Sequence, residues 1–122
     1  MAETTDPQSL LPLSNLVFEV LVSLADQDRH GYGIIKDIEQ RTQGALSVRS
    51  GALYTVIQRL LESGLVQTAP TPEGEDAVDA RRKYYSITGL GREVAALEGA
   101  RLAQMVAAAR SRHLISEREI HP

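Results

Sequence analysis

Residues 50–64 read SGALYTVIQRLLESG, and this stretch decides the fold of the chain. Its large apolar side chains recur at spacings of three and four residues, which places them on one face of a helix. They are Leu53, Val56, Ile57, Leu60 and Leu61. Ser50 can cap the start of this helix, and Gly64 stands where a glycine in left-handed conformation ends one. The stretch therefore predicts a helix roughly 21 Å long with one buried face.

Two further helices are predicted on the N-terminal side of this stretch. Apolar residues recur at helical spacing through residues 15–25, and Ser14 is suited to cap that segment. These apolar residues are Leu16, Val17, Val20, Leu21 and Leu24. A second and shorter stripe consists of Ile34, Ile35 and Ile38. It predicts a helix that follows the turn composition of residues 26–31 and ends near residues 42–44. Residues 1–12 are polar, contain two prolines and predict a loose arm, although Leu10, Leu11 and Leu13 could dock on a neighbour.

On the C-terminal side, the pattern changes from helical spacing to short β-prone runs. Residues 65–68 and 83–87 are such runs. The connector between them, residues 69–80, is rich in proline, glycine and acidic residues. The two runs and their connector predict a β-hairpin.

A long last helix is predicted after the hairpin. Thr88 can cap an alanine-rich segment that runs from Gly89 to about Arg112. Its apolar members are Leu90, Val94, Leu97, Leu102, Met105 and Val106. Gly99 costs a helix about 1 kcal/mol relative to alanine, and Arg101 stands where a strict heptad places an apolar residue. We therefore expect a kink or a register shift near the middle of this helix.

Three short helices followed by a two-stranded ribbon is the element order of a winged helix-turn-helix. The predicted fold class is mainly α with a β-hairpin (α+β). We divide the chain into an arm at residues 1–12, the winged helix-turn-helix at residues 13–88, and a dimerisation helix with its tail at residues 89–122. In folds of this kind the third helix enters the major groove of DNA and the hairpin touches the flanking backbone.

Composition excludes several classes of protein. A chain of 122 residues has the length of one domain, contains no cysteine and has no apolar run near the roughly 20 residues that cross a bilayer, so no membrane partner is expected. We expect a cytoplasmic protein, because residues 1–6 lack the basic and apolar regions of a secretory signal. No Ser/His/Asp order, glycine-rich phosphate loop or pair of carboxylates on one predicted face indicates an enzyme. The three histidines fall in different predicted elements, so we expect no metal site and no cofactor.

The charges are distributed unevenly along the chain. Thirteen Lys and Arg against sixteen Asp and Glu give a net charge of −3, which by itself argues against a nucleic-acid partner. The exposed face of the helix at residues 50–64, however, carries hydroxyls, an amide and a cation, which suit base edges and phosphates. This face and the basic run after the connector form the predicted DNA-binding surface, which consists of Ser50, Tyr54, Thr55, Gln58, Arg59, Arg81, Arg82 and Lys83. Taken singly, each patch is equally compatible with an ordinary solvated surface.

The connector itself is acidic. Its carboxylates are Glu73, Glu75, Asp76 and Asp79. The minor groove has a negative potential that repels carboxylates. We therefore expect the tip of the hairpin to lie away from DNA.

The length of the last helix predicts a homodimer. A helix of about 24 residues is roughly 36 Å long, more than a small three-helix domain can cover. A two-fold partner would bury its apolar stripe together with the first helix, and would present two recognition helices roughly 34 Å apart. The predicted dimerisation residues are Leu16, Val20, Leu90, Val94, Leu97, Leu102, Met105 and Val106.

Several motifs, in order, resemble one known family. They are HGYGI at residues 30–34, SGALY at 50–54, RL at 59–60, GLV at 64–66, RKYYSIT at 82–88 and GR at 91–92. This pattern, which spans roughly residues 13–95, resembles the PadR family of bacterial transcriptional regulators, in its smaller subfamily with one helix after the wing. The resemblance implies a dimeric repressor whose third helix reads DNA and whose last helix dimerises. It places Ser50, Tyr54 and Arg59 on the recognition helix, and Arg82 and Lys83 on the basic wing strand.

The chain departs from this family pattern in two ways. Its wing connector is long and acidic. Some small members bind flat aromatic drugs between aromatic side chains at the dimer interface, whereas this chain has no tryptophan and only Phe18 with four tyrosines. The resemblance therefore leaves open a small-molecule effector, whose identity the sequence does not provide.

The aromatic residues and glycines of these motifs have structural interpretations as well. Gly31 and Gly33 indicate a tight turn or a close backbone approach at the start of the second helix. Tyr32, Tyr84 and Tyr85 are expected to be core or interface rings rather than DNA contacts. For Tyr54 both interpretations stay open.

Two functions from different classes remain. The first is a DNA-binding repressor that recognises a pseudo-palindromic operator. The alternative is a winged-helix module for protein association without DNA affinity, which the negative net charge favours. Salt-dependent binding to DNA distinguishes them, because only the first neutralises phosphates.

Overall fold

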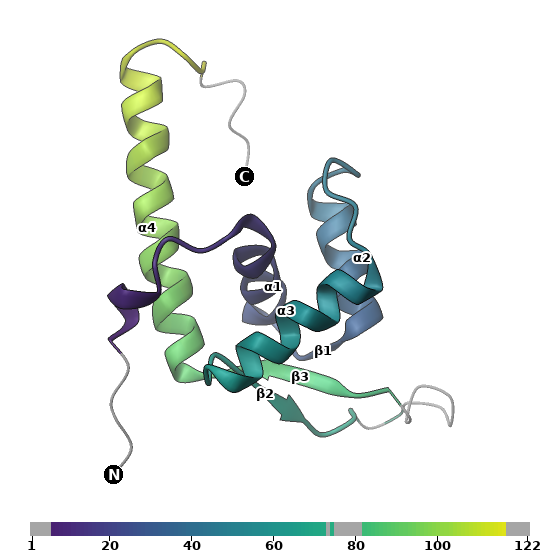
Figure 1. The fold of residues 1–122 in the computed structure, drawn as a ribbon. Helices are drawn as coiled ribbons and strands as arrows, with labels where there is room; N and C mark the ends of the chain where they lie inside the picture. Colours follow the sequence, from purple (N-terminus) through teal and green to yellow (C-terminus); the bar gives the residue numbers. More distant parts are fainter. Residues whose placement is uncertain (1–5, 73, 75–81, 117–122) are drawn as a thin grey trace.

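The computed structural model describes residues 6–72, 74 and 82–116. In chain order the elements are η1 (Pro7–Leu10), α1 (Asn15–Ala25), β1 (Arg29–His30), α2 (Gly31–Arg41), α3 (Ser50–Glu62), β2 (Val66–Ala69), β3 (Tyr84–Ile87) and α4 (Gly89–Ser111), as Figure 1 shows. Helices and a small antiparallel sheet make up one fold, which confirms the predicted α+β class. In the described part of the chain, no helix is both long and apolar enough to span a membrane.

The helix ends follow the capping signals of the sequence, with one exception. The hydroxyls of Ser14 and Thr88 accept hydrogen bonds from backbone N–H groups of the helices they precede, as predicted. Gly64 has a φ of +77°, as expected for the residue that ends α3. The prediction that Ser50 caps α3 is wrong, since Arg49 is the extended N-cap residue and its carbonyl already accepts the first helical hydrogen bond, from Leu53. Ser50 is therefore the first residue inside the helix.

The sheet has three strands in the order β1-β3-β2, so it contains one more strand than the predicted hairpin. Strands β2 and β3 pair antiparallel with Val66 opposite Ile87, which confirms the hairpin. Strand β1 is only two residues long and pairs with the other edge of β3, with His30 opposite Tyr84. Its residues lie in a stretch of turn composition and are too few to show an alternating pattern, so sequence reasoning missed them.

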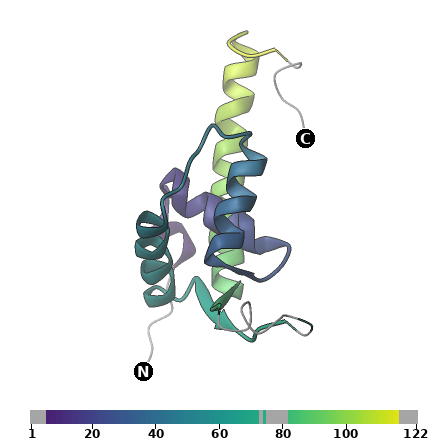
Figure 2. The same cartoon turned by 90° about the vertical axis from the view of Figure 1, so that its right-hand side faces the viewer.

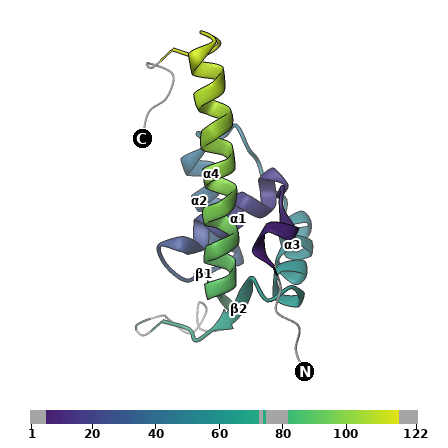
Figure 3. The same cartoon turned by 90° about the vertical axis from the view of Figure 1, so that its left-hand side faces the viewer.

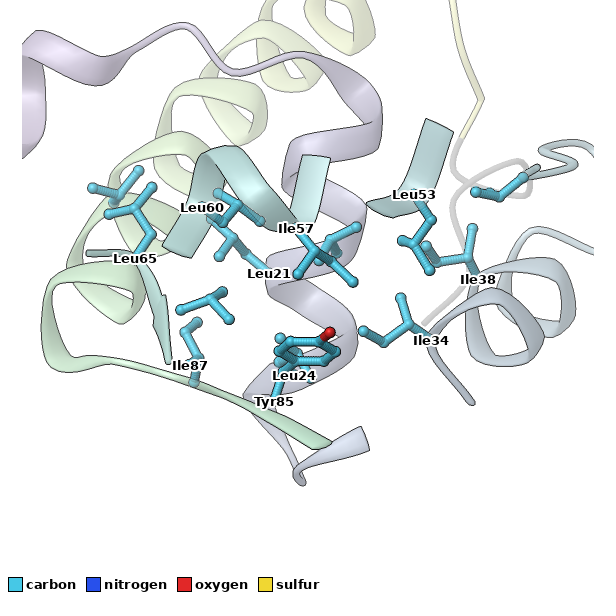
Figure 4. Close-up of a cluster of buried hydrophobic side chains, with 14 residues drawn as sticks. Leu21, Leu24, Ile34, Ile38, Leu53, Ile57, Leu60, Leu65, Tyr85 and Ile87 are labelled. Atoms are coloured by element: carbon cyan, nitrogen blue, oxygen red, sulfur yellow. The ribbon is translucent and has the colours of Figure 1, made fainter. Parts of the chain in front are cut away.

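The core lies between α1, α2, α3 and the sheet (Figure 4). It is built from the apolar faces that the sequence predicted, together with Tyr85 and Ile87 of β3. Val20 and Val94, two of the predicted dimerisation residues, have no exposed surface because they are packed inside this core. This corrects the predicted set: neither side chain has any surface left for a partner subunit.

Helix α4 starts beside the sheet and continues well beyond the core, so that its C-terminal part stands apart from the other helices (Figures 1 and 3). It runs without interruption from Gly89 to Ser111, so the expected kink near Gly99 is not seen. Arg101 does not disturb the helix, because its guanidinium reaches back to the carboxylate of Glu98.

The described residues of the segment before α1 contact α4 and do not form a loose arm. Residues 7–10 form a short 3-10 helix, and the side chain of Asp6 accepts a hydrogen bond from the N–H of Gln8 at its start. The N–H of Leu13 donates a hydrogen bond of 2.7 Å to the buried carboxylate of Glu98 on α4. The arm that we expected at residues 1–12 is therefore packed against α4 from residue 6 onward, while residues 1–5 lie outside the described residues.

Candidate nucleic-acid interface

Helix α3 lies at the outer edge of the molecule (Figure 2). Its exposed residues are mostly polar. Leu53, Ile57 and Leu60 face the core. The five residues that the sequence assigned to DNA contact on this helix are all exposed, and they are Ser50, Tyr54, Thr55, Gln58 and Arg59. At 100° per residue, Gln58 lies about 40° from Tyr54 around the helix, whereas Arg59 lies about 140° from it. Ser50 lies about 40° from Tyr54 on the opposite side, so the face is broad, with Ser50 at one margin and Arg59 at the other.

The start of α3 differs from the starts of the other three α-helices. Side chains of Ser14, His30 and Thr88 cap α1, α2 and α4, whereas no side chain caps α3. Its first three residues are exposed, and the N–H groups at the start of a helix have no partner within the helix. Exposed N–H groups and the helix dipole both favour an anion at this end.

A cavity of about 260 Å³ lies where α2, α3 and the start of β3 meet. It is lined by His30, Gly31, Tyr32, Tyr54, Arg82 and Lys83. A Cβ atom at Gly31 would lie 2.5 Å from the Tyr54 hydroxyl oxygen, so only glycine lets that ring approach the first residue of α2. This is the close approach predicted as one reason for Gly31. The cavity brings Tyr54, Arg82 and Lys83, three predicted DNA-contact residues from distant parts of the sequence, to one place.

Beside this cavity, aromatic rings and cations contact one another. The Nδ1 atom of His30 accepts a hydrogen bond of 2.9 Å from the N–H of Gly33, and its Nε2 atom lies 3.0 Å from a guanidinium nitrogen of Arg82. The Arg82 guanidinium lies 5.7 Å from the centre of the Tyr32 ring, and the Lys36 ammonium lies 5.4 Å from the same point. Both distances are within the range of cation–π attraction.

The tyrosines divide between core and surface. Tyr84 and Tyr85 are buried, as expected for core rings. Burial raises the pKa of the Tyr85 hydroxyl, with a smaller effect from Tyr54. Tyr32 does not belong to the core, because 54% of its surface is exposed. The sequence did not assign Tyr32, His30 or Lys36 to the interface, and the HGYGI motif was the only signal near them.

Two other cations of the N-terminal half, Arg29 and Arg41, form ion pairs with carboxylates. Arg41 on α2 bridges Asp37 at 2.9 Å and Glu19 of α1 at 2.7 Å. Arg29 of β1 reaches the same Asp37 at 3.6 Å, and the buried Ser23 hydroxyl donates to it at 2.7 Å. Burial raises the pKa of Asp37, but the hydrogen bonds from Arg41 and Ser23 outweigh it and hold the pKa below its usual value. This network ties α1, β1 and α2 together.

Some predictions cannot be placed in the structure. Arg81 lies outside the described residues, and so do the connector carboxylates of Glu73, Glu75, Asp76 and Asp79. The predicted position of the wing tip therefore stays a prediction. Within the described ranges, no group of three His, Cys, Asp or Glu side chains is arranged to hold a metal ion.

A helix-turn-helix core with an exposed polar third helix and an adjoining β-ribbon defines a winged helix-turn-helix protein. The chain belongs to the PadR-like family of transcriptional regulators, whose family model matches residues 20–97. A further match is an uncharacterized protein of Lysinibacillus sphaericus, which is 33% identical over 73 residues. That match covers 60% of this chain and 64% of the relative, so the chain spans less than two thirds of the relative's length.

Solved structures have the same fold at lower sequence identity. A PadR family transcription regulator from Clostridium difficile matches with a TM-score of 0.67 and 19% identity, over 80% of this chain and 97% of that one. Bacillus subtilis PadR in complex with operator DNA matches with a TM-score of 0.55 and 20% identity, over 66% of this chain and 44% of that one. At these identities the likeness supports the fold.

Proposed function

We propose that this protein is a transcriptional repressor that binds a pseudo-palindromic DNA operator as a homodimer. The observation that carries the proposal is the position of Arg82 and Lys83, the two cations just before β3, which we call the wing root. Arg82 and Lys83 line one cavity with Tyr54 of α3, so the polar face of α3 and the start of β3 form one continuous surface. Such a surface fits a duplex whose major groove receives α3.

Each group on this surface suits a particular part of DNA. The amide of Gln58 can bond adenine through two hydrogen bonds, and the guanidinium of Arg59 can bond guanine or a phosphate. Ser50 and the uncapped start of α3 suit a phosphate oxygen. Arg82 and Lys83 would contact the DNA backbone beside the groove. The same contact is predicted from the sequence for Arg81. Bacillus subtilis PadR, which has this fold, forms a complex with operator DNA, and this supports DNA as the partner.

The homodimer is proposed from the apolar surface that the protomer leaves exposed. Met105, Val106 and Leu114 are exposed by 56%, 38% and 74%, all on or just after the part of α4 that extends past the core. A groove with a volume of about 460 Å³ opens between α1, the α2–α3 connection and Leu102 of α4. Of the predicted dimerisation residues, those that keep surface for a partner are Leu16, Leu90, Leu97, Leu102, Met105 and Val106.

The experiment starts by selecting a binding site from a random duplex library with the full chain. Binding of the selected duplex is then measured by fluorescence anisotropy over a range of salt concentrations. Substituting alanine for Arg59 is expected to weaken binding by about 1 to 3 kcal/mol and to relax the preference at one base pair. Replacing Arg82 and Lys83 together with alanine is expected to lower the salt slope by about 2, because each phosphate contact contributes about 0.9.

Arg110→Ala serves as the matched control. Arg110 is exposed near the C-terminal end of α4, at the end of the molecule opposite the sheet (Figure 1). Its loss removes one positive charge without touching the proposed surface, so affinity and slope should stay close to those of the wild type. Absence of salt-dependent DNA binding by the wild-type chain would overturn the proposal and favour the protein-association module, the alternative that the net charge of −3 supports.

A further inference from the structure

The cavity between α2, α3 and β3 combines the features of an anion site. Lys83 and Arg82 supply positive charge, and the Tyr54 hydroxyl supplies a hydrogen-bond donor. No carboxylate is among the six residues that line it. Its volume of about 260 Å³ exceeds the roughly 30 Å³ of a water molecule in the liquid several times, so a phosphodiester group fits with some of its water.

The Tyr54 hydroxyl lies close to the backbone of Gly31. Because Gly31 has no side chain, the phenol lies against the first turn of α2. The ring is half-exposed, so its hydroxyl stays accessible from the solvent side.

The Tyr32 ring positions a further cation at the margin of the cavity. Lys36 lies one turn after Tyr32 on α2, and its ammonium is 5.4 Å from the ring centre. The same ring contacts the guanidinium of Arg82 at 5.7 Å. The Tyr32 ring, which lines the cavity, therefore contacts both Lys36 of α2 and Arg82, which precedes β3.

We propose that this cavity binds one phosphate of the DNA backbone in each half-site, with Tyr54, Arg82 and Lys83 as its direct contacts. Lys36 contributes charge from the margin, and Tyr32 and Gly31 are positioning residues. The inference rests on the proposed DNA-binding function and adds to it a defined contact of α2, which the sequence did not assign. If α2, α3 and the wing all contribute to one phosphate contact, recognition of DNA depends on how these three elements are placed relative to one another.

The test replaces single backbone phosphates of the selected duplex with neutral methylphosphonates. For the wild type, one position in each half-site is expected to lower affinity roughly tenfold, because a charge-assisted contact is lost there. In Tyr54→Phe and in Lys36→Gln the same replacement is expected to cost less than in the wild type, since part of that contact is already absent. Lys36→Gln should also lower the salt slope by about 1, whereas Arg110→Gln, the matched control, should not.

Gly31→Ala tests the positioning role. The added Cβ displaces the Tyr54 hydroxyl, so the substitution should weaken binding in the wild-type background. In the Tyr54→Phe background it should have a smaller effect on affinity, because the hydroxyl is no longer there to lose. Thermal unfolding of each variant, followed by circular dichroism, separates loss of contact from loss of fold.

The outcomes separate this inference from the proposed function. If the wild type binds the selected duplex with a salt slope, but Tyr54→Phe and Lys36→Gln show wild-type affinity and an unchanged methylphosphonate pattern, the phosphate site is wrong and the DNA-binding proposal stands. If the wild type binds no duplex in a salt-dependent way, both fall. A position-specific methylphosphonate effect that disappears in both variants supports the site.

Discussion

The two halves of α4 belong to one continuous helix but have opposite surroundings. In the N-terminal half, Gly91, Val94 and Glu98 are buried against the sheet, the core and the N-terminal segment. In the C-terminal half, residues 103–108 are all exposed, although they include Met105 and Val106. The backbone is helical in both halves, so helix formation does not reveal which part packs within the protomer. Packing in the first half defines the fold, and the second half leaves Met105 and Val106 exposed, on the surface that we propose for a partner subunit.

The largest effect is expected from a charge placed in the exposed half. Met105→Glu should weaken dimerisation by about 4 kcal/mol, because two-fold symmetry places the change twice in one interface. This corresponds to an increase of about a thousandfold in the dissociation constant. Light scattering after size exclusion, over a range of protein concentrations, measures it.

Gln104→Glu is the control for this substitution. Gln104 is the preceding residue and borders a cavity with Gln8 and Leu11, on the side of α4 that faces the N-terminal segment. The Gln104→Glu substitution adds the same negative charge on a different side of α4 from Met105, so it should leave the dissociation constant of the dimer nearly unchanged. A wild-type chain that stays monomeric at micromolar concentration would contradict the proposal that the C-terminal half of α4 packs against a partner subunit.

The second effect concerns close packing in the buried half. A Cβ atom at Gly91 would lie 2.2 Å from the carbonyl oxygen of Leu65 and 2.8 Å from a side-chain carbon of Ile87. Because the first of these atoms is backbone, Gly91→Ala should destabilise the fold by about 3 kcal/mol. Urea unfolding followed by circular dichroism measures the change.

Gly99→Ala makes the same substitution further along the helix, where a Cβ atom would meet nothing within 4 Å. It should stabilise the protein by about 0.5 to 1 kcal/mol, since glycine is unfavourable inside a helix. Equal urea midpoints for the two variants would show that packing does not distinguish the two glycines.

The smallest effect is expected at the boundary between the halves, where Glu98 is buried. Hydrogen bonds from Arg101 hold the pKa of Glu98 below its usual value of 4.5, against the opposing effect of burial and with help from the N–H of Leu13. Glu98→Gln, which keeps the shape but not the charge, should cost about 1 to 2 kcal/mol at neutral pH.

The sign of the pH dependence follows from this lowered pKa. A carboxyl that is more acidic in the folded than in the unfolded state stabilises the fold fully above the unfolded pKa, near 4.5. This contribution is lost as the pH falls through the lower pKa of the folded state. The difference in urea midpoint between wild type and Glu98→Gln should therefore be constant above about pH 5 and should shrink below 4.5. A difference that stays constant through the acid range would show that the charge of Glu98 has no stabilising role.

Much of the fold could be predicted because its signals are local. The limits of α1 and α4, the caps at Ser14 and Thr88, and the β-hairpin each depend on residues within a few positions of one another. Sequence reasoning failed at β1, whose two residues form a strand only because an edge of β3 lies beside them. It also failed to separate Val94 from Met105, since both lie on the apolar stripe of the same helix.

The sequence alone determined the order of the four α-helices and the hairpin, the apolar faces of the helices and the family, because hydrophobic period, capping and motif order are properties of neighbouring residues. Only the tertiary structure decided which residues meet across the chain. It placed Tyr54 against Gly31, and it buried Glu98 beneath the N–H of Leu13, which lies 85 positions earlier. Such contacts arise when several elements pack at once, and the relative placement of packed elements is not contained in the pattern of any one of them.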